Sequence, residues 1–172
     1  MMTRLEDVIE DPVLRLRYVF RRSSPEVLQI ELWIEPGGGV TPHVHPRMRE
    51  RFEVLEGRPE FLAGRTWQAA GPGEEVVVDS GVRHAFRNRG DAVAHVMCEA
   101  TPPLTLQEFL TDAAAMARAG KFIRPGIPKP SGVLPAAMLI KRHRDMVVLS
   151  NPPPFLQPLL FPLARLGERR AR

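Results

Sequence analysis

Short apolar or alternating segments, separated by turn residues, fill the chain from about Leu14 to Glu99. Nine of the 13 glycines lie between Gly37 and Gly90, at or near the breaks between these segments. Strands at this spacing, with no long helical period between them, predict an antiparallel sandwich or barrel rather than an alternating α/β fold. The segments are LRLRYVF, VLQIELWI, RFEVLEG, PEFLAG, EEVVVD, HAFRN and VAHVMCE.

The pattern changes after Pro102-Pro103, where helical periodicity begins. Thr105 followed by Glu108 is typical of a capping box, and Gly120 is placed to end the helix. Beyond it we expect an extended linker over 125–135, a helix over about 136–148 and a shorter helix over 155–166. The first of these helices is predicted from one apolar stripe, formed by Leu106, Phe109, Leu110, Ala113, Met116 and Ala117.

Length and charge add to this picture of an N-terminal body and a C-terminal extension. With 172 residues and 44% hydrophobic content the chain can build one real core. Residues 1–117 hold 13 Lys and Arg against 18 Asp and Glu, whereas 118–172 hold 11 against 2. We therefore expect a β-barrel domain of mildly acidic charge at 1–103 and a C-terminal helical, Pro-rich basic extension at 104–172.

The basic extension could contact nucleic acid, an anionic membrane, the acidic body or a second subunit. Nucleic acid is disfavoured, because readers of nucleic acid usually interleave aromatic residues for stacking, and the basic residues 118–172 offer only Phe122, Phe155 and Phe161. Residues 146–164 carry no charge, but five prolines interrupt them and argue against a membrane span.

Two alternatives stay open for the end of the chain. A helix over 155–166 could lie in a membrane interface, with nearby arginines reaching anionic headgroups. The favoured alternative is that the extension packs on the barrel or across a homodimer. The arginines in question are Arg165, Arg169, Arg170 and Arg172.

Cysteine content and the start of the chain indicate the compartment. Cys98 is the only cysteine, so a disulfide within the chain is excluded, and we expect it to be a small buried hydrophobe in a reducing cytosol. The first twenty residues lack the apolar run of a signal peptide. A cytoplasmic location is expected.

Three histidines and one glutamate carry the most informative chemistry. His43 and His45 alternate on a strand, so both imidazoles leave the same face, and Glu50 follows after four residues. His84 stands alone after a later turn. If they converge inside a barrel, these nitrogen and oxygen donors suit a divalent transition metal and leave coordination positions open.

The spacing of these residues resembles the two motifs of the cupin superfamily, in particular small single-barrel bacterial members of the conserved-barrel type. Gly37, His43, His45, Glu50 and Gly57 meet every spacing of the first motif. The second motif is met at four positions, with Asp79 where proline is usual; Asp79-Ser80-Gly81 can still form the turn. Those four positions are Gly73, Gly81, His84 and Asn88.

The resemblance covers roughly residues 25–103 and implies a fold and a metal site. The implied fold is all-β, a double-stranded β-helix or jelly-roll barrel, here followed by C-terminal α-helices. The implied ligands are His43, His45, Glu50 and His84. The implied cofactor is a divalent transition metal, with iron expected first and manganese, nickel, copper or zinc as alternatives.

Other residues are candidates for the wall of the cavity. Because Glu50 points inward, Phe52 and Val54 should as well, and Phe86 should follow His84. These three favour an apolar or aromatic small molecule, or they only fill the barrel. We expect His143, in a KRHR segment, to be exposed, and we expect Arg47 and Arg49 to be solvated loop residues.

For two polar strand faces, the sequence does not decide whether the side chains point into the barrel or outward. One is formed by Gln29, Glu31 and Trp33, and the other by His95, Met97 and Glu99. If either faces inward it could orient substrate or act as acid and base; if outward, it could serve a subunit contact. Tyr18 is the only tyrosine and has no predicted place.

These observations predict a metal-dependent enzyme of the oxygenase type that acts on a small organic molecule. No catalytic side chain beyond the metal ligands is assigned. Metal-assisted isomerase, cyclase or lyase chemistry is the alternative within the enzymes, and would need an inward Glu or His as base. A non-catalytic binding or sensing module, peripherally membrane-associated through the C-terminal helix, is the alternative outside them.

Overall fold

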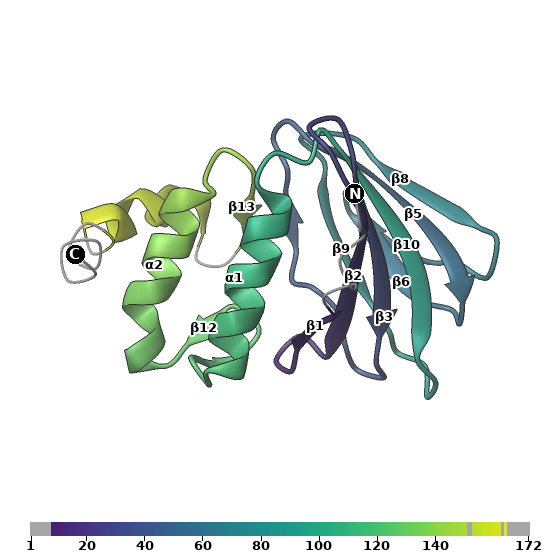
Figure 1. Ribbon diagram of the computed structural model, residues 1–172, viewed down its shortest axis with the longest axis horizontal. Coiled ribbons are helices and arrows are strands. Elements are labelled where there is room, and N and C mark those ends of the chain that lie inside the picture. The colour runs from purple at the N-terminus through teal and green to yellow at the C-terminus, as the bar shows by residue number, and fades with distance from the viewer. Residues whose placement is uncertain (1–7, 151–152, 163, 165–172) are drawn as a thin grey trace, which may run out of the picture.

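Two antiparallel sheets face each other and form the barrel in the computed structural model, which describes residues 8–150, 153–162 and 164 (Figure 1). The larger sheet has the strand order β1-β2-β3-β10-β5-β8 and the smaller one the order β13-β4-β9-β6-β7. The barrel strands are β1 Val8–Asp11, β2 Leu16–Ser23, β3 Leu28–Ile34, β4 His43–Val44, β5 Arg49–Glu56, β6 Glu60–Ala63, β7 Thr66–Ala69, β8 Glu75–Val78, β9 Arg83–Arg87, β10 Ala94–Thr101 and β13 Val148–Leu149.

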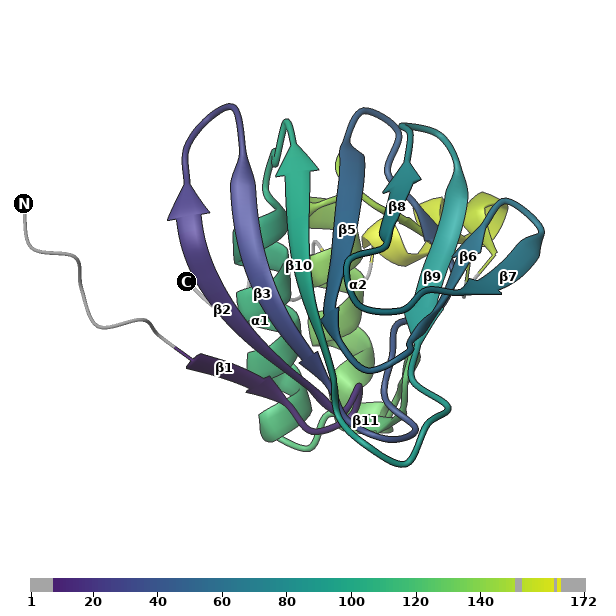
Figure 2. The same cartoon turned by 90° about the vertical axis from the view of Figure 1, so that its right-hand side faces the viewer.

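Alternation along the strands decides which side chains enter the barrel. On β5, Phe52 and Val54 are buried, whereas Arg51 and Glu53 point to the outer face, where they form an ion pair. Strands β3 and β10 lie side by side in the middle of the larger sheet (Figure 2) and follow the same rule. Their inward residues fill the core between the sheets. The predicted all-β jelly-roll barrel with C-terminal helices is confirmed.

Helix α1, Leu106–Arg118, ends as the sequence predicts but begins differently. Gly120 has φ +66°, and the N–H groups of Gly120 and Lys121 donate to the carbonyls of Ala117 and Met116, which forms a complete Schellman cap. The predicted capping box is wrong, because Thr105 makes no side-chain cap bond. Its hydroxyl instead lies 2.8 Å from His143 Nδ1.

The segment after α1 is more structured than the predicted linker. Strands β11 Phe122–Arg124 and β12 Ile127–Pro128 form a hairpin, a 3₁₀ turn covers Pro130–Gly132, and α2 covers Val133–Arg142. The helix predicted at 136–148 therefore starts and ends earlier. Over the third predicted helix, 155–166, the structure has a 3₁₀ segment, Pro154–Leu160, with Pro158 inside it, followed by helical residues at 161, 162 and 164; the other positions lie outside the described residues.

The extension lies against one side of the barrel and contributes to it (Figures 1 and 2). Helix α1 contacts β1. Strand β13 pairs with β4 in the register Val148↔Val44 and Leu149↔His43. The Ser150 N–H also donates to the Pro42 carbonyl. The extension therefore adds a strand directly beside the one that carries His43.

His143 is buried, so the expected exposed position is wrong. Only 1% of its surface is accessible, although Arg142 and Arg144 beside it are exposed. The reason is tertiary: His143 follows the last turn of α2 and packs edge-on against Phe109 of α1. Burial, reinforced by the Arg142 charge, lowers the pKa of His143 below its ordinary value near 6.5.

Acidification should therefore destabilise the protein partly through His143. Its pKa is lower folded than unfolded, so its neutral form stabilises the fold above about pH 6.5, and this contribution is lost as pH falls below that value. We expect the free energy of unfolding to fall more steeply from pH 7 to pH 5 in the wild type than in His143→Gln. Urea denaturation across this range measures it, and equal slopes would contradict the expectation.

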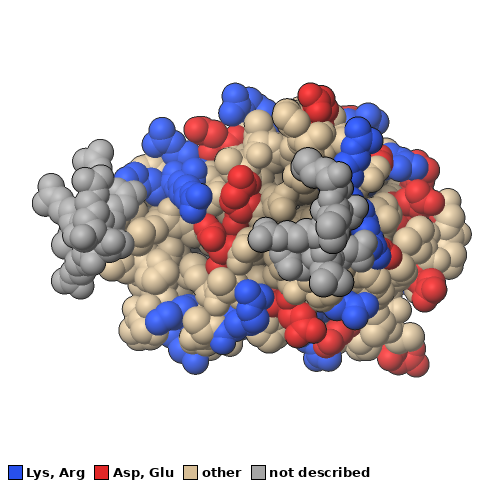
Figure 3. All heavy atoms as spheres, in the orientation of Figure 1, with Lys and Arg blue, Asp and Glu red and all other residues tan. Residues whose placement is uncertain are grey.

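Surface charge and hydropathy add two observations. On the face seen in Figure 3, Lys and Arg gather over the helical side, while both signs are mixed over the barrel. Among the described residues, no helix combines the length and the apolar character needed to cross a bilayer.

Candidate metal centre

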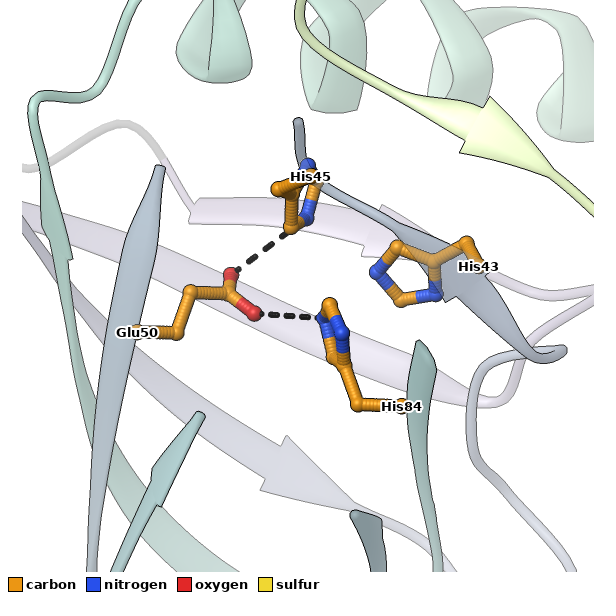
Figure 4. Close-up of side chains that lie close together, drawn as sticks. All are labelled: His43, His45, Glu50 and His84. Atoms are coloured by element: carbon orange, nitrogen blue, oxygen red, sulfur yellow. Dashed lines mark ion pairs between the residues drawn. The ribbon is translucent and has the colours of Figure 1, made fainter. Parts of the chain in front are cut away.

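The four predicted ligands lie together inside the barrel. His43 is on β4, His45 follows it, Glu50 is on β5 and His84 is on β9. One ligand atom from each of the four lies within 4.8 Å of the others. Antiparallel pairing explains the meeting, because β4 places His43 directly opposite His84 on β9. Figure 4 shows the three rings and the carboxylate pointing toward one common centre.

Backbone carbonyls hold all three imidazoles. The Nδ1 atoms of His43, His45 and His84 lie 2.9 Å from the carbonyl oxygens of Thr41, Met146 and Val82, respectively. A carbonyl only accepts, so each Nδ1 must carry the proton and donate it. In the neutral rings each Nε2 then offers a lone pair, which is the arrangement of metal-ligating histidines whose other nitrogen is bonded to a backbone carbonyl.

Burial keeps two of the rings neutral. It lowers the pKa of His43 to about 3, helped by the nearby His84 and His45, and it also lowers the pKa of His45. A neutral imidazole is the form that binds a metal. His43 and His45 therefore need to lose no proton on metal binding at neutral pH.

Glu50 and His84 form the closest pair of side chains in the site. Burial acts to raise the pKa of Glu50, but the hydrogen bond and charge of His84 outweigh it and lower the pKa. Burial acts to lower the pKa of His84, but the nearby Glu50 carboxylate has the larger combined effect and raises this pKa above its ordinary value. The His84 Nε2 to Glu50 Oε2 distance is 2.8 Å, and that from His45 Nε2 to Glu50 Oε1 is 3.7 Å.

The geometry fits a cation at the centre. His84 Nε2 is completely buried and has no well-aligned hydrogen-bond partner. With His84 in its neutral form, three nitrogen donors and one carboxylate face one point, and lone pairs left unused there cost free energy when buried. A divalent transition metal would use all of them, and this donor set suits iron, manganese, nickel, copper or zinc. The identity of the metal is not determined.

The turn before β9, which precedes His84, is hydrogen-bonded to the segment that carries His45. Asp79-Ser80-Gly81 does form a turn, closed by Val82 N–H donating to the Asp79 carbonyl at 3.2 Å. Gly81 has φ +80°, and its N–H donates to the His45 carbonyl at 2.8 Å. Asp79 in the position usually held by proline is therefore compatible with the turn. Asn88 lies outside the centre and donates to the carbonyls of Ile34 and Ala92.

A cavity of about 400 Å³ extends from the metal centre to the helical extension. The metal ligands His43, His45 and Glu50 form part of its wall, and the rest of the wall is mainly apolar. Phe52 and Phe86 line it, as does the buried Cys98. Val54 is buried but lies in the core beyond the cavity wall. The extension supplies the opposite wall through Phe109, Leu110, Ile127, Ala137 and Ile140.

The two polar strand faces point outward, away from the cavity. His95 Nε2 lies 2.7 Å from Glu31 Oε1 and the His95 ring stacks on Trp33, while Gln29 donates to Glu99. These side chains therefore take no part in the interior site. Arg47 and Arg49 are exposed, and Arg49 pairs with Asp79.

The sequence analysis did not predict three features of the site. The Met146 carbonyl that holds His45 lies 101 residues away along the chain, with no local signal. Thr41 and Val82 each precede their histidine by two residues, a shared spacing that could have been noticed. Asp11 and Tyr18 line the cavity from β1 and β2, which no pattern indicated.

Comparisons with known proteins agree with this architecture. Residues 31–98 match the sequence model of a family described as the cupin domain. No curated protein sequence matches the chain. Similar solved structures include TT1209 from Thermus thermophilus, at 19% identity and TM-score 0.52, covering 58% of this chain and 98% of that one.

Two further structures have the same degree of similarity. KdgF from a Halomonas species is 19% identical with a TM-score of 0.52, covering 56% of this chain and 86% of that one. An RmlC-like cupin from Shewanella frigidimarina NCIMB 400 is 17% identical with a TM-score of 0.52, covering 59% and 88%. At these identities the likeness establishes the fold alone.

Proposed function

We propose that this chain, whose barrel is a cupin domain, is a metal-dependent enzyme that acts on a small, largely apolar organic molecule, with oxygenase chemistry as the reaction class. One observation carries the proposal. Three carbonyl-anchored imidazoles and a buried carboxylate converge within 4.8 Å at the wall of an apolar cavity. Such a centre holds a cation while leaving space for substrate.

Different groups of the protein would bind the cation, orient the imidazole rings and line the substrate cavity. His43, His45, Glu50 and His84 would hold the cation, and iron bound there would supply dioxygen activation. The carbonyls of Thr41, Met146 and Val82 fix the three rings in orientation. Phe52 and Phe86 line the cavity and exclude water near the centre.

Metal-assisted isomerase or lyase chemistry is the alternative within the enzymes. It requires an inward base; the bases that the sequence offered, Glu31, Glu99 and His95, are on the outer face of the barrel, whereas the Asp11 carboxyl group lines the cavity. The oxygenase hypothesis requires no such base. A cytoplasmic location is part of the proposal, since the lone cysteine is buried and reduced, as in proteins of a reducing compartment.

A homodimer and a peripheral membrane contact stay predictions. Phe155 and Leu159 of the 3₁₀ segment are 77% and 69% exposed, which suits an interfacial contact. The arginines expected to accompany them, from Arg165 onward, lie outside the described residues.

Dioxygen consumption tests the proposed reaction class. The protein is loaded anaerobically with Fe²⁺ or with Zn²⁺ and mixed with a panel of apolar carbonyl and enol compounds in air-saturated buffer. We expect oxygen uptake with iron only, and loss of uptake in His84→Ala. Equal turnover of a compound by both metal forms, without oxygen uptake, would favour the isomerase or lyase alternative. Binding of compounds with no turnover by either form would favour the non-catalytic alternative.

A further inference from the structure

The cavity has a second polar region besides the metal centre. It is formed by Asp11 at the end of β1 and Tyr18 on β2, both of which line the same cavity as His43 and Glu50. Neither residue belongs to the cupin motifs or to the metal centre. Their exposed fractions are only 4% and 2%, so both side chains are enclosed by the protein.

Strand pairing places these two side chains on the same inner face. Asp11 is opposite Leu16 in the β1–β2 register, and Tyr18 is two residues beyond Leu16. Diagonal neighbours of this kind have Cβ atoms about 7–8 Å apart, within reach of a tyrosine. The charge of Asp11 is also felt at Tyr18, where it adds to the larger effect of burial and raises the pKa of the phenol.

Each residue presents a polar atom without a partner. Asp11 Oδ1 accepts the N–H groups of Val13 and Leu14, both at 2.9 Å. Within the described part of the chain, its other oxygen accepts no hydrogen bond, and the Tyr18 hydroxyl neither donates nor accepts one. Neither atom is among the fully buried polar atoms of the described residues, so both face the open space of the cavity, where a ligand group can reach them.

A ligand hydroxyl would satisfy both atoms at once. It could donate to the free Asp11 oxygen and accept from the Tyr18 hydroxyl. An apolar group at the same position would leave both unsatisfied. The pair therefore discriminates in favour of a hydroxyl, as sites built to hydrogen-bond a substrate group do.

The register also gives the separation from the metal centre. Tyr18 on β2 is in one cross-strand row with Leu32, Val96 and Val54. Val54 is on β5, three strands away from β2, and Glu50 precedes it on β5 by four residues. Standard strand spacings put the two backbone positions roughly 14 Å apart across the strands and roughly 13 Å along them. Side chains and sheet curvature shorten that span, so a single elongated ligand can reach from one polar region to the other.

We infer that the cavity takes an elongated substrate with three parts: an oxygen-bearing head at the metal centre, an apolar body, and a hydroxyl at the far end bound by Asp11 and Tyr18. The inference rests on the proposed function for its head group. Asp11 and Tyr18 are thereby specificity-determining residues of a site that the metal ligands alone do not define.

Matched pairs of metal-binding compounds test it. The probes are straight-chain hydroxamic acids of about five to ten carbons, each made with a terminal methyl group or with a terminal hydroxyl in its place. Binding to the Zn²⁺-loaded full-length protein is measured by calorimetry. At the chain length that reaches Asp11 and Tyr18, we expect the hydroxyl compound to bind about tenfold tighter or more.

Two variants test whether Asp11 and Tyr18 cause the tighter binding of the hydroxyl compounds. Tyr18→Phe removes only the phenolic oxygen, and Asp11→Asn retains an oxygen for the Val13 and Leu14 N–H groups. We expect the gain to disappear in Tyr18→Phe and to shrink in Asp11→Asn. The methyl-terminated compounds should bind Tyr18→Phe more tightly than the wild type, because the polar atom that their apolar end leaves unsatisfied is gone, and retained binding also verifies that the variants fold and hold metal.

The outcomes separate this inference from the function on which it rests. If the hydroxyl gives no gain at any length, or if its gain persists in both variants, the role of Asp11 and Tyr18 is refuted. If the methyl-terminated compounds bind equally well with and without Zn²⁺, the metal centre does not bind the head group, and the proposed function fails instead.

Discussion

The variant His84→Ala should bind a divalent metal at least about 100-fold more weakly than the wild type. His84 is one of four donors, and its Nε2 is a buried nitrogen that has no well-aligned hydrogen-bond partner. Removing it also leaves the buried Glu50 carboxylate without its nearest positive partner, 2.8 Å away. Both effects act in the same direction, since the site loses a ligand and its carboxylate becomes easier to protonate.

Metal analysis of protein purified without added metals measures this effect, followed by titration with Zn²⁺ or Fe²⁺. The matched control is His95→Ala, which removes a histidine from the outer face of the barrel, where its partners are Glu31 and Trp33. The control should hold as much metal as the wild type, and circular dichroism should show all three proteins folded. A wild type that holds no more metal than His84→Ala would remove the basis of the proposed function.

The variant Gly39→Ala should lose about 3 kcal/mol or more of stability, which corresponds to a fall in Tm of roughly 6–12 °C for a chain of this size. Gly39 has φ +149°, and a Cβ there would lie 2.3 Å from the Phe86 carbonyl oxygen and 2.7 Å from Arg87 Cα. Those atoms belong to the backbone of β9, which cannot move without displacing His84 on the same strand.

The variant Gly64→Ala separates crowding from backbone strain. Gly64 has φ +70°, but a Cβ there would meet nothing within 4 Å. It should cost only the strain of the left-handed conformation, about 1–2 kcal/mol. Thermal and urea unfolding of the two variants provide the comparison. Similar losses in both would mean that the close approach of Gly39 to β9 contributes nothing to the fold.

Local patterns were enough to predict most barrel strands, though not β1, β7 or β13. Alternation along β5 assigns each residue to a face, and the resemblance of the spacing of His43, His45, Glu50 and His84 to the cupin motifs implied one site. Such predictions succeed because period-two alternation and turn residues act over a few positions. The same locality explains the correct end of α1 at Gly120.

Predictions failed where a distant partner replaced a local one. The Thr105 hydroxyl lies beside His143 instead of capping α1, and His143 is buried although charged residues flank it. Each depends on the packing of α1 against α2, a contact between segments some 38 residues apart. The phase of the Glu31 and His95 faces likewise required the sheet itself.

The sequence by itself therefore determined most of the strands, the inward and outward residues of β5, and the donors available for a metal, because these follow from neighbours along the chain. Only the tertiary structure decided that β13 pairs beside His43, that the Met146 carbonyl holds His45, and that Asp11 and Tyr18 share a cavity with the metal centre. Those contacts join segments far apart in the chain, and no periodicity encodes which distant backbone group will complete a buried hydrogen bond.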